Sequence, residues 1–255
     1  IWNARVFRLP TAGKKLSAGK SLGQQVIGMK KIQMIAVLIV ILSIAMAAMA
    51  YLALPDTVAS HWGVSGRPNG YSSKLFAVAI FPALSVLILA IYYILPKIDP
   101  KMKAYGGFER EYGQLFIAIL AFLQYIFALT ILFNAGVRLN IIQWLAPAFA
   151  VLFYFAGKAM LASKQNYFVG FRTPWTLASA TVWEKTNRLA GSMLMAAAAI
   201  ALIGIVLPSI GLFGAIGIAI ATAIVGCAYS YVEYQAEAKR ASRQPGKKAK
   251  SGRKK

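Results

Sequence analysis

Long apolar runs with no charged residue in their middle constrain the fold of this 255-residue chain more than any other feature. Each run has about the twenty residues that a helix needs to cross the hydrocarbon core of a bilayer. Because backbone polar groups must be paired inside a membrane, such runs predict helices. The runs cover residues 32–54, 76–95, 114–136, 141–161, 189–207 and 210–231. The sequence therefore predicts an all-α, polytopic membrane helix bundle with about six transmembrane helices.

Composition supports this class and argues against two others. Hydrophobic residues make up 59% of the chain and charged residues only 14%, whereas soluble domains contain about 25% charged residues. The net charge of +21 would suit a nucleic-acid partner, but the basic residues lie in the tails and alternate loops, which argues against one. The single cysteine, Cys227, excludes an intrachain disulfide and a multi-cysteine metal site.

Lysine and arginine are distributed very unequally between the two sides of the predicted bundle. With six spans, 25 of the 28 basic residues fall on one side. The other side has Arg67, Lys74 and Arg138. The positive-inside rule then places both termini in the cytoplasm and the loop of residues 55–73 outside. We expect a multi-pass protein of the plasma membrane, with the lipid bilayer as its first partner.

Both tails are basic and are expected to lie outside the packed domain. Residues 1–28 have little periodicity and predict a disordered extension. Met29 is followed by two lysines and an apolar run, as is ordinary at the start of a membrane protein. We therefore favour Met29 as the natural initiator. The alternative is that residues 1–28 are a genuine basic cytoplasmic tail. Residues 29–234 form the six-span domain. Residues 235–255 are rich in lysine and arginine, so we expect a disordered tail that lies near anionic lipid. Binding of nucleic acid by this tail is the alternative.

The outer loop, residues 55–73, contains many turn-forming residues. Asn69-Gly70 indicates a tight turn, and His61 and Trp62 suit the headgroup boundary. Since His61 is the only histidine and no thiolate lies nearby, the loop predicts no metal site. We expect this imidazole to bond a loop carbonyl, with pH sensing or ligand contact as the alternative.

The longest polar segment between the apolar runs, residues 164–188, is here called the signature loop. A helix is expected to begin within it, between Ser179 and Thr181. Thr181 and Glu184 have the spacing of a capping box, and Glu184 and Arg188 that of an ion pair. One face of this helix carries Trp183, Asn187 and Ala190. These features predict an ordered, half-buried loop at the membrane surface.

Two further patterns concern packing inside the bundle. Gln114, Gln124 and Asn134 are ten residues apart, which we interpret as one helix face carrying three amides. Bonding between helices is the favoured role for these amides, with a polar substrate path as the alternative. The glycines between residues 204 and 226 predict that the last two spans form a tightly packed hairpin.

Two motifs resemble those of the SdpI family, which is named for an immunity protein against a secreted killing factor. The resemblance covers residues from about 30 to 234. In the signature loop the matching residues are Asn166, Gly170, Arg172, Thr173, Pro174, Trp175, Thr176, Trp183, Lys185, Asn187 and Arg188. In the outer loop they are Leu54, Pro55, His61, Trp62, Gly66, Pro68, Tyr71 and Lys74. Asn69 and Gly63 depart from the aspartate and asparagine expected there.

The resemblance implies immunity to a secreted peptide toxin outside and membrane sequestration of a small transcriptional repressor inside. Toxin contact would fall on Pro55, His61, Trp62, Gly66, Pro68 and Tyr71. Repressor contact would fall on Asn166, Gly170, Arg172, Thr173, Pro174, Trp175, Trp183, Asn187 and Arg188.

The sequence contains no nucleophile with a paired base, no metal cluster and no phosphate-binding loop. We therefore expect a non-enzymatic protein without cofactors. A transporter for small solutes or lipids, and a structural membrane protein with a polybasic tail, are the alternatives to the immunity role.

Overall fold

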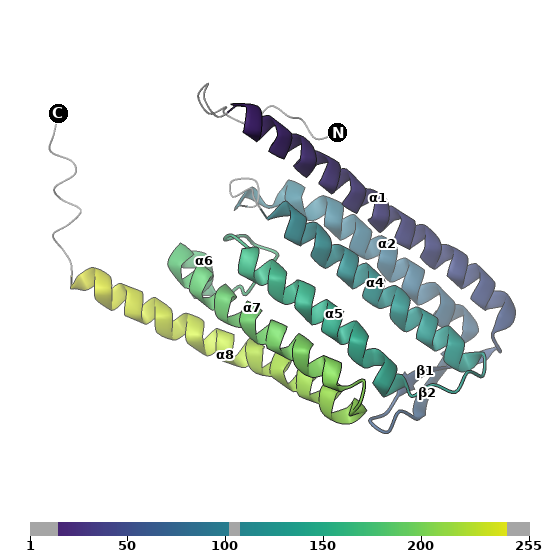
Figure 1. The fold of residues 1–255 in the computed structure, drawn as a ribbon. Coiled ribbons are helices and arrows are strands. Elements are labelled where there is room, and N and C mark those ends of the chain that lie inside the picture. Colours follow the sequence, from purple (N-terminus) through teal and green to yellow (C-terminus); the bar gives the residue numbers. More distant parts are fainter. Residues whose placement is uncertain (1–14, 102–107, 244–255) are drawn as a thin grey trace.

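A computed structural model of the protein describes residues 15–101 and 108–243, with side chains described from residue 28 onward. Its long helices are α1 (Lys15–Ala53), α2 (Lys74–Ile98), α4 (Glu109–Asn134), α5 (Ile141–Ala162), α7 (Ala180–Ile203) and α8 (Pro208–Ser242). Strands β1 (Thr57–Trp62) and β2 (Pro68–Ser73) form a hairpin between α1 and α2, and the short helix α6 (Pro174–Ala178) precedes α7. Within the described ranges, six helices are long and apolar enough to span a membrane, which confirms the predicted all-α polytopic bundle (Figure 1).

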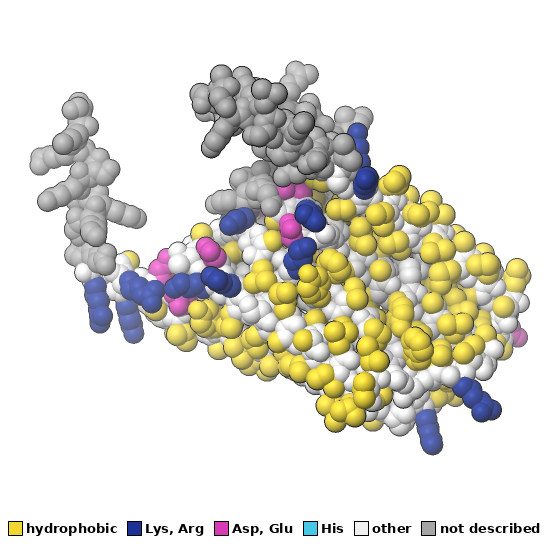
Figure 2. All heavy atoms as spheres, viewed as in Figure 1, with side chains coloured by type: hydrophobic (Ala, Val, Ile, Leu, Met, Phe, Trp, Pro, Cys, Tyr) yellow, Lys and Arg dark blue, Asp and Glu magenta, His cyan; other side chains and the backbone are white. Residues whose placement is uncertain are grey.

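The surface of the bundle has the composition expected for contact with lipid. Figure 2 shows hydrophobic side chains over the middle of the molecule and lysine and arginine side chains toward its two ends. Leu38 and Ile41 on α1, and Ile220 and Ile224 on α8, are among the exposed large apolar residues. Since contiguous apolar surface of this kind is rare on soluble monomers, acyl chains are its natural cover.

The helices are arranged as two halves, each built from three long helices. The first half contains α1, α2 and α4, and the second contains α5, α7 and α8. Packing of α4 against α5 is the principal helix contact between the halves. Leu120 of α4 is fully buried against α1 in the first half, and Ala197, Ala201 and Ala215 pack together in the second.

Small residues allow the helices of the second half to approach closely. A Cβ atom on Gly211 would lie 1.9 Å from the backbone nitrogen of Gly204, so the turn between α7 and α8 leaves no room for a side chain. This agrees with the predicted tight hairpin of the last two spans. A second close contact, which the sequence analysis missed, joins α5 to α7, because a Cβ atom on Gly157 would lie 2.7 Å from the carbonyl oxygen of Gly191.

Each half contributes to both ends of the bundle. The β1–β2 hairpin and the α4–α5 connection lie at one end, which we call the hairpin end. The start of α1, the end of α8 and the signature loop lie at the opposite end, which we call the signature-loop end (Figure 1). The two described ends of the chain therefore lie at the same end of the bundle.

Helices α1 and α7 begin well before the apolar runs that predict them. Helix α1 begins at Lys15 and so includes the second half of the segment expected to be disordered, while residues 1–14 lie outside the described ranges. Helix α7 begins at Ala180, within the predicted interval, and its first turns are amphipathic rather than apolar. At the other end of the chain, α8 continues to Ser242 into the expected basic tail, of which residues 244–255 are not described.

The outer loop folds as a β-hairpin, and the tight turn predicted at Asn69-Gly70 is wrong. Both residues lie in β2, where Gly70 pairs with His61 across the hairpin. A Cβ atom on Gly70 would lie 2.9 Å from the Cβ atom of His61, so this glycine permits a close strand contact. The turn lies earlier, at residues 63–67, where Gly66 has a φ of +74°. Turn-forming residues are dense throughout this loop, so composition alone did not locate the reversal.

The interpretation of three amides on one face of α4 is also wrong. Lys158 of α5 donates to Gln114 at 2.9 Å, whereas Gln124 donates to Ser85 of α2 at 2.8 Å and Asn134 bonds to Ala59 of β1. Ten residues correspond to about 2.8 helical turns, so each step rotates the side chain by about 80°. The amides consequently bond to three different neighbours. The favoured role in bonding between helices is confirmed for Gln114 and Gln124, whereas Asn134 bonds a strand.

Candidate functional site

Asn166 organises the start of the signature loop. Its side chain is only 1% exposed. Its Oδ1 accepts from the backbone nitrogens of Phe168 at 2.9 Å and Val169 at 2.6 Å, and its Nδ2 donates to the carbonyl of Val169 at 2.7 Å. A second donation from Nδ2 reaches the carbonyl of Lys164 at 2.8 Å. One buried amide thus forms hydrogen bonds with four backbone groups. These bonds explain how a segment without regular secondary structure stays ordered.

Gly170 and Asn187 form the next contact, between the signature loop and α7. Asn187 accepts from the backbone nitrogen of Phe171 at 2.7 Å and donates to the carbonyl of Trp183 at 3.0 Å. Gly170 has a φ of +118°, and a Cβ atom on it would lie 2.6 Å from Asn187 Oδ1 and 2.9 Å from the Trp183 ring. The Trp183 indole is 2% exposed and donates to the carbonyl of Ser163 at 3.2 Å. Glycine is therefore required here by backbone conformation and by space.

Helix α6 is capped by the signature loop and docked on α8. Thr173 and Thr176 form a capping box, in which each side chain accepts from the other's backbone nitrogen. The Thr173 hydroxyl also donates to Ser230 of α8 at 3.0 Å. Trp175 meets Tyr231 edge to face, with ring centroids 5.1 Å apart. The capping box predicted at Thr181 and Glu184 is wrong, because another hydroxyl caps α7.

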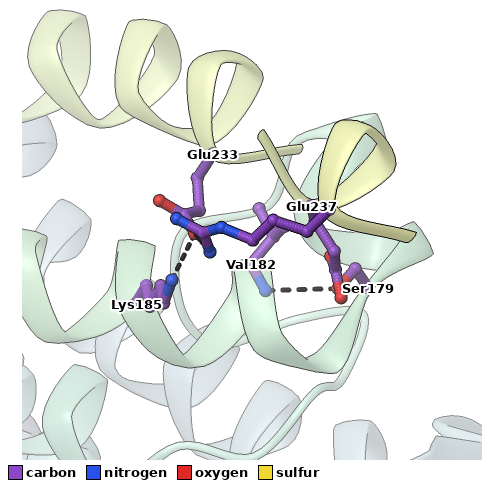
Figure 3. A network of polar contacts seen from close by, with 6 residues as sticks. Ser179, Val182, Lys185, Glu233 and Glu237 are labelled. Atoms are coloured by element: carbon purple, nitrogen blue, oxygen red, sulfur yellow. Dashed lines mark hydrogen bonds and ion pairs between the residues drawn. The ribbon is translucent and has the colours of Figure 1, made fainter. Parts of the chain in front are cut away.

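That capping residue is Ser179, which accepts from the backbone nitrogen of Val182 at 3.3 Å and donates to Glu237 of α8 at 2.5 Å. Figure 3 shows Glu233 and Glu237 of α8 directed toward Lys185 and Ser179 at the start of α7. Lys185 forms an ion pair with Glu233. The ion pair expected between Glu184 and Arg188 is absent, although both side chains are exposed on α7.

The signature loop joins the two halves at its end of the bundle. Asp99, at the end of α2, accepts from the backbone nitrogen of Tyr167 at 2.8 Å and is fully buried. Val169 packs in an aromatic cluster of the first half with Tyr92 and Phe116. The later part of the same loop packs on α7 and α8 of the second half, as described above. Its conformation therefore depends on how the two halves are placed relative to each other.

The predicted signature-loop site divides by exposure into two groups. The first group lies in the interior and stabilises the loop; its members are Asn166, Gly170, Thr173, Trp183 and Asn187. Trp175 is half-buried against α8. The exposed residues are Arg172, Pro174 and Arg188. Arg172 donates to the carbonyl of Tyr167 at 2.7 Å, so its guanidinium is held at the surface. A cavity of about 190 Å³ lies between the end of α5, the start of the signature loop and the start of α7, and its lining residues include Lys164, Glu184 and Trp183.

The hairpin end carries the second predicted site. Pro55, His61 and Tyr71 are exposed, whereas Gly66 and Pro68 are half-buried. His61 Nδ1 lies 2.5 Å from Asn69 Oδ1, so its partner is a side chain and not the expected loop carbonyl. Within residues 15–101 and 108–243, no group of histidine, cysteine and acidic residues could hold a metal ion.

Trp62 attaches the hairpin to the end of α4. Its ring meets Phe133 edge to face at a centroid distance of 5.3 Å. Next to it, Asn134 accepts from the backbone nitrogen of Ala59 at 2.7 Å and donates to the carbonyl of Ala59 at 3.0 Å. Because both Asn134 and Phe133 belong to α4, the hairpin is held by the helix that also contacts the second half.

Sequence reasoning missed several residues that support the two sites. Asp99, Ser230 and Glu233 each bond a partner far away in sequence, so local spacing carried no signal for them. Asn134 was singled out as an amide, but nothing in the sequence connected it to the hairpin. Arg138 was counted only as one of three basic residues on the less charged side.

Comparisons with known proteins agree with this architecture. The model of the SdpI/YfhL protein family matches residues 162–230, which include the whole signature loop, all of α7 and much of α8. A domain of unknown function (DUF1648) matches residues 38–86, which span the hairpin and the helices that flank it. The Immunity protein SdpI of Bacillus subtilis (strain 168) is 31% identical over 171 residues, 66% of this chain and 77% of that protein.

No solved structure matches the chain. The identity to SdpI extends over more than three quarters of that protein, and it is accompanied by the family match across the signature loop. Together with the six apolar helices, these matches identify a multi-pass protein of the plasma membrane. The chain belongs to the SdpI/YfhL protein family.

Proposed function

We propose that this protein protects its cell from a secreted peptide toxin and has no enzymatic role. The support is its 31% identity to a protein whose name is Immunity protein SdpI. In this proposal the hairpin end faces outward, as the distribution of lysine and arginine indicates, and meets the peptide. His61, Tyr71 and Pro55 are the residues of the predicted contact set that are accessible on the hairpin.

We further propose that the signature loop binds a small cytoplasmic repressor when the outer site is occupied. The observation that carries this step is the position of the loop across both halves, with Tyr167 bonded to Asp99 and Thr173 bonded to Ser230. A peptide that changed the placement of the halves would change the loop. Arg172, Pro174 and Arg188 would contact the repressor directly, and the buried residues of the set would hold them in place.

A transporter role has less support than immunity. It rested on a line of amides along one span, and those amides bond to three different elements of the protein. Because these amides do not lie along one face of α4, they cannot line a polar path through the membrane. A purely structural membrane protein is the other alternative, and it would need the bond of Arg172 to the Tyr167 carbonyl only to hold the loop.

The repressor step is tested with Arg172→Ala and its matched control Arg110→Ala, at the start of α4 and outside the predicted contact set. Both side chains are exposed, but only Arg172 bonds the loop. We expect both variants to reach the membrane in normal amounts and Arg172→Ala to lose recruitment of a cytoplasmic partner, measured by co-purification from toxin-treated cells. Toxin protection should persist, because it uses the other end of the molecule. Normal recruitment by Arg172→Ala would contradict the proposed role of this residue.

A further inference from the structure

An open hollow of about 480 Å³ lies at the hairpin end, beside the predicted outer site. It is lined by Ser65, Gly66, Phe133, Arg138, Leu139 and Asn140. Two of these residues belong to the turn of the hairpin, and the others belong to the end of α4 and the α4–α5 connection. The hollow therefore lies where the hairpin of the first half meets the start of the second half (Figure 1).

The charge around this hollow is positive and unbalanced. Arg138 lines it and Arg67 lies on the adjacent turn, and both side chains are exposed. Asp56 is the single acidic residue in the loops at this end of the bundle, and it pairs with Lys74 at 3.1 Å. No ion pair of the described residues involves either arginine. An anionic group in the hollow would meet the Arg138 guanidinium without an acidic competitor, and Arg67, which does not line the hollow, would add only longer-range positive charge.

The walls of the hollow are held in place before any ligand binds. Asn140 caps α5 by accepting from the backbone nitrogen of Gln143 at 3.3 Å. Gly66 fits against this cap, because a Cβ atom on it would lie 3.3 Å from Asn140 Oδ1. Phe133 is braced by the Trp62 ring and supplies an apolar wall. A pre-formed surface with one cation beside an apolar wall suits a ligand that combines a carboxylate with an apolar side chain.

We propose that this hollow binds an acidic segment of a secreted peptide, with a carboxylate on Arg138 and a neighbouring apolar side chain on Phe133 and Leu139. A guanidinium can hold a carboxylate through two parallel hydrogen bonds, which a lysine ammonium cannot reproduce. The inference rests on the proposed immunity function and names the peptide class and the binding residue. Binding here would act on both halves at once, since the walls come from each.

The test uses the full chain in nanodiscs of phosphatidylcholine and a fluorescent peptide that combines leucine with glutamate. Its twin carries glutamine in place of every glutamate. We expect the glutamate peptide to bind about tenfold more tightly than its twin, as one charge-assisted contact would give. Arg138→Ala should weaken it by about tenfold and Arg138→Lys by less, whereas the matched control Arg67→Ala should change affinity by less than about twofold.

Three results in nanodiscs would overturn the inference. The first is equal binding of the glutamate and glutamine peptides. The second is equal loss from Arg67→Ala and Arg138→Ala, which would indicate non-specific attraction to positive charge. The third is loss of Arg138-dependent binding when phosphatidylglycerol is added to the disc, which would assign the hollow to an anionic lipid.

A parallel measurement in cells separates this inference from the proposed function. If the unaltered chain protects cells from a toxin and Arg138→Ala does not, at equal membrane abundance, both are supported. If Arg138→Ala protects as well as the unaltered chain, the inference is overturned and the immunity function stands. If the unaltered chain gives no protection, the immunity function is overturned, and the nanodisc measurement alone decides whether the hollow binds acidic peptides.

Discussion

Asn134 at the end of α4 holds both backbone polar groups of Ala59 in β1 by two hydrogen bonds, of 2.7 and 3.0 Å. The amide acts here as an additional strand residue, because it pairs with both the N–H and the carbonyl of one backbone position. Ala59 is only 3% exposed, so neither group has water as an alternative partner. This contact makes the position of the outer hairpin depend on the helix that packs against the second half of the bundle.

We predict that Asn134→Ala loosens the hairpin. It leaves two buried backbone groups of Ala59 unpaired, at a cost of about 1–3 kcal/mol in the free energy of unfolding. The control is Asn69→Ala, which removes an amide bonded to His61 on the exposed side of the same hairpin. Unfolding in detergent, followed by tryptophan fluorescence, should show the loss for Asn134→Ala alone. Equal stability of the two variants would contradict the docking role.

The membrane-spanning helices could be predicted from sequence because length and lack of charge are local properties. The start of α7 at Ala180 was predicted from the signature loop and not from an apolar run, since Val182 and Trp183 are buried within an amphipathic segment. The hairpin was missed because turn-forming residues lie in its strands as well as in its turn. The amides of α4 were placed on one face because ten residues were treated as three whole turns.

The signature loop illustrates what sequence can and cannot show about a site. Its dense motif identified the right segment and the buried face of α7. It did not separate residues that build the loop from residues that a partner can reach. That distinction depends on Asp99, Ser230 and Glu233, which approach from α2 and α8, and no local spacing relates them to the motif.

Three glycines separate the effects of backbone conformation and of space. Gly217→Ala should be neutral or stabilise α8, because its φ is ordinary and no atom lies within 4 Å of the new Cβ. Gly136→Ala has equal space but a φ of +90°, so it should cost about 1–3 kcal/mol. Gly170→Ala adds a clash with Asn187 to a φ of +118° and should be the most damaging.

The measurement for this series is the amount of folded protein in the membrane together with the unfolding midpoint in detergent. We expect the order Gly217→Ala, Gly136→Ala, Gly170→Ala from the least to the most damaging. If Gly170→Ala were as well tolerated as Gly217→Ala, the packing described for the signature loop would be incorrect.

The ion pairs of Glu233 should stabilise the end of α8 against α7. Its side chain is 12% exposed and accepts from Lys185 and from Arg240, the latter at 3.3 Å. Glu233→Gln should lower the free energy of unfolding by about 1 kcal/mol, since the basic partners are partly solvated and screened. Glu184→Gln is the control, because that carboxylate lies exposed on α7 and forms no ion pair. The difference between the variants should shrink at high salt, and a constant difference would argue against an electrostatic origin.

The orientation of the bundle is predicted by charge and can be measured with single cysteines. We suggest Ser65→Cys in the hairpin turn and Ala178→Cys at the end of α6, both exposed, in a Cys227→Ala background. On intact cells an impermeant thiol reagent should label the Ser65→Cys variant, and the Ala178→Cys variant should react only after the cells are opened. The opposite pattern would reverse the proposed roles of the two ends.

The central claim is that this protein confers immunity, and survival under toxin is its most direct test. The chain would be expressed in a Bacillus subtilis strain that lacks its own Immunity protein SdpI, and the cells would be exposed to the toxin against which that protein gives immunity. We predict that cells carrying the chain survive and that cells carrying an empty vector die. The protection given by Gly170→Ala should be proportional to the amount of that variant in the membrane. Death of cells that contain normal amounts of the unaltered protein in their membrane would contradict the account.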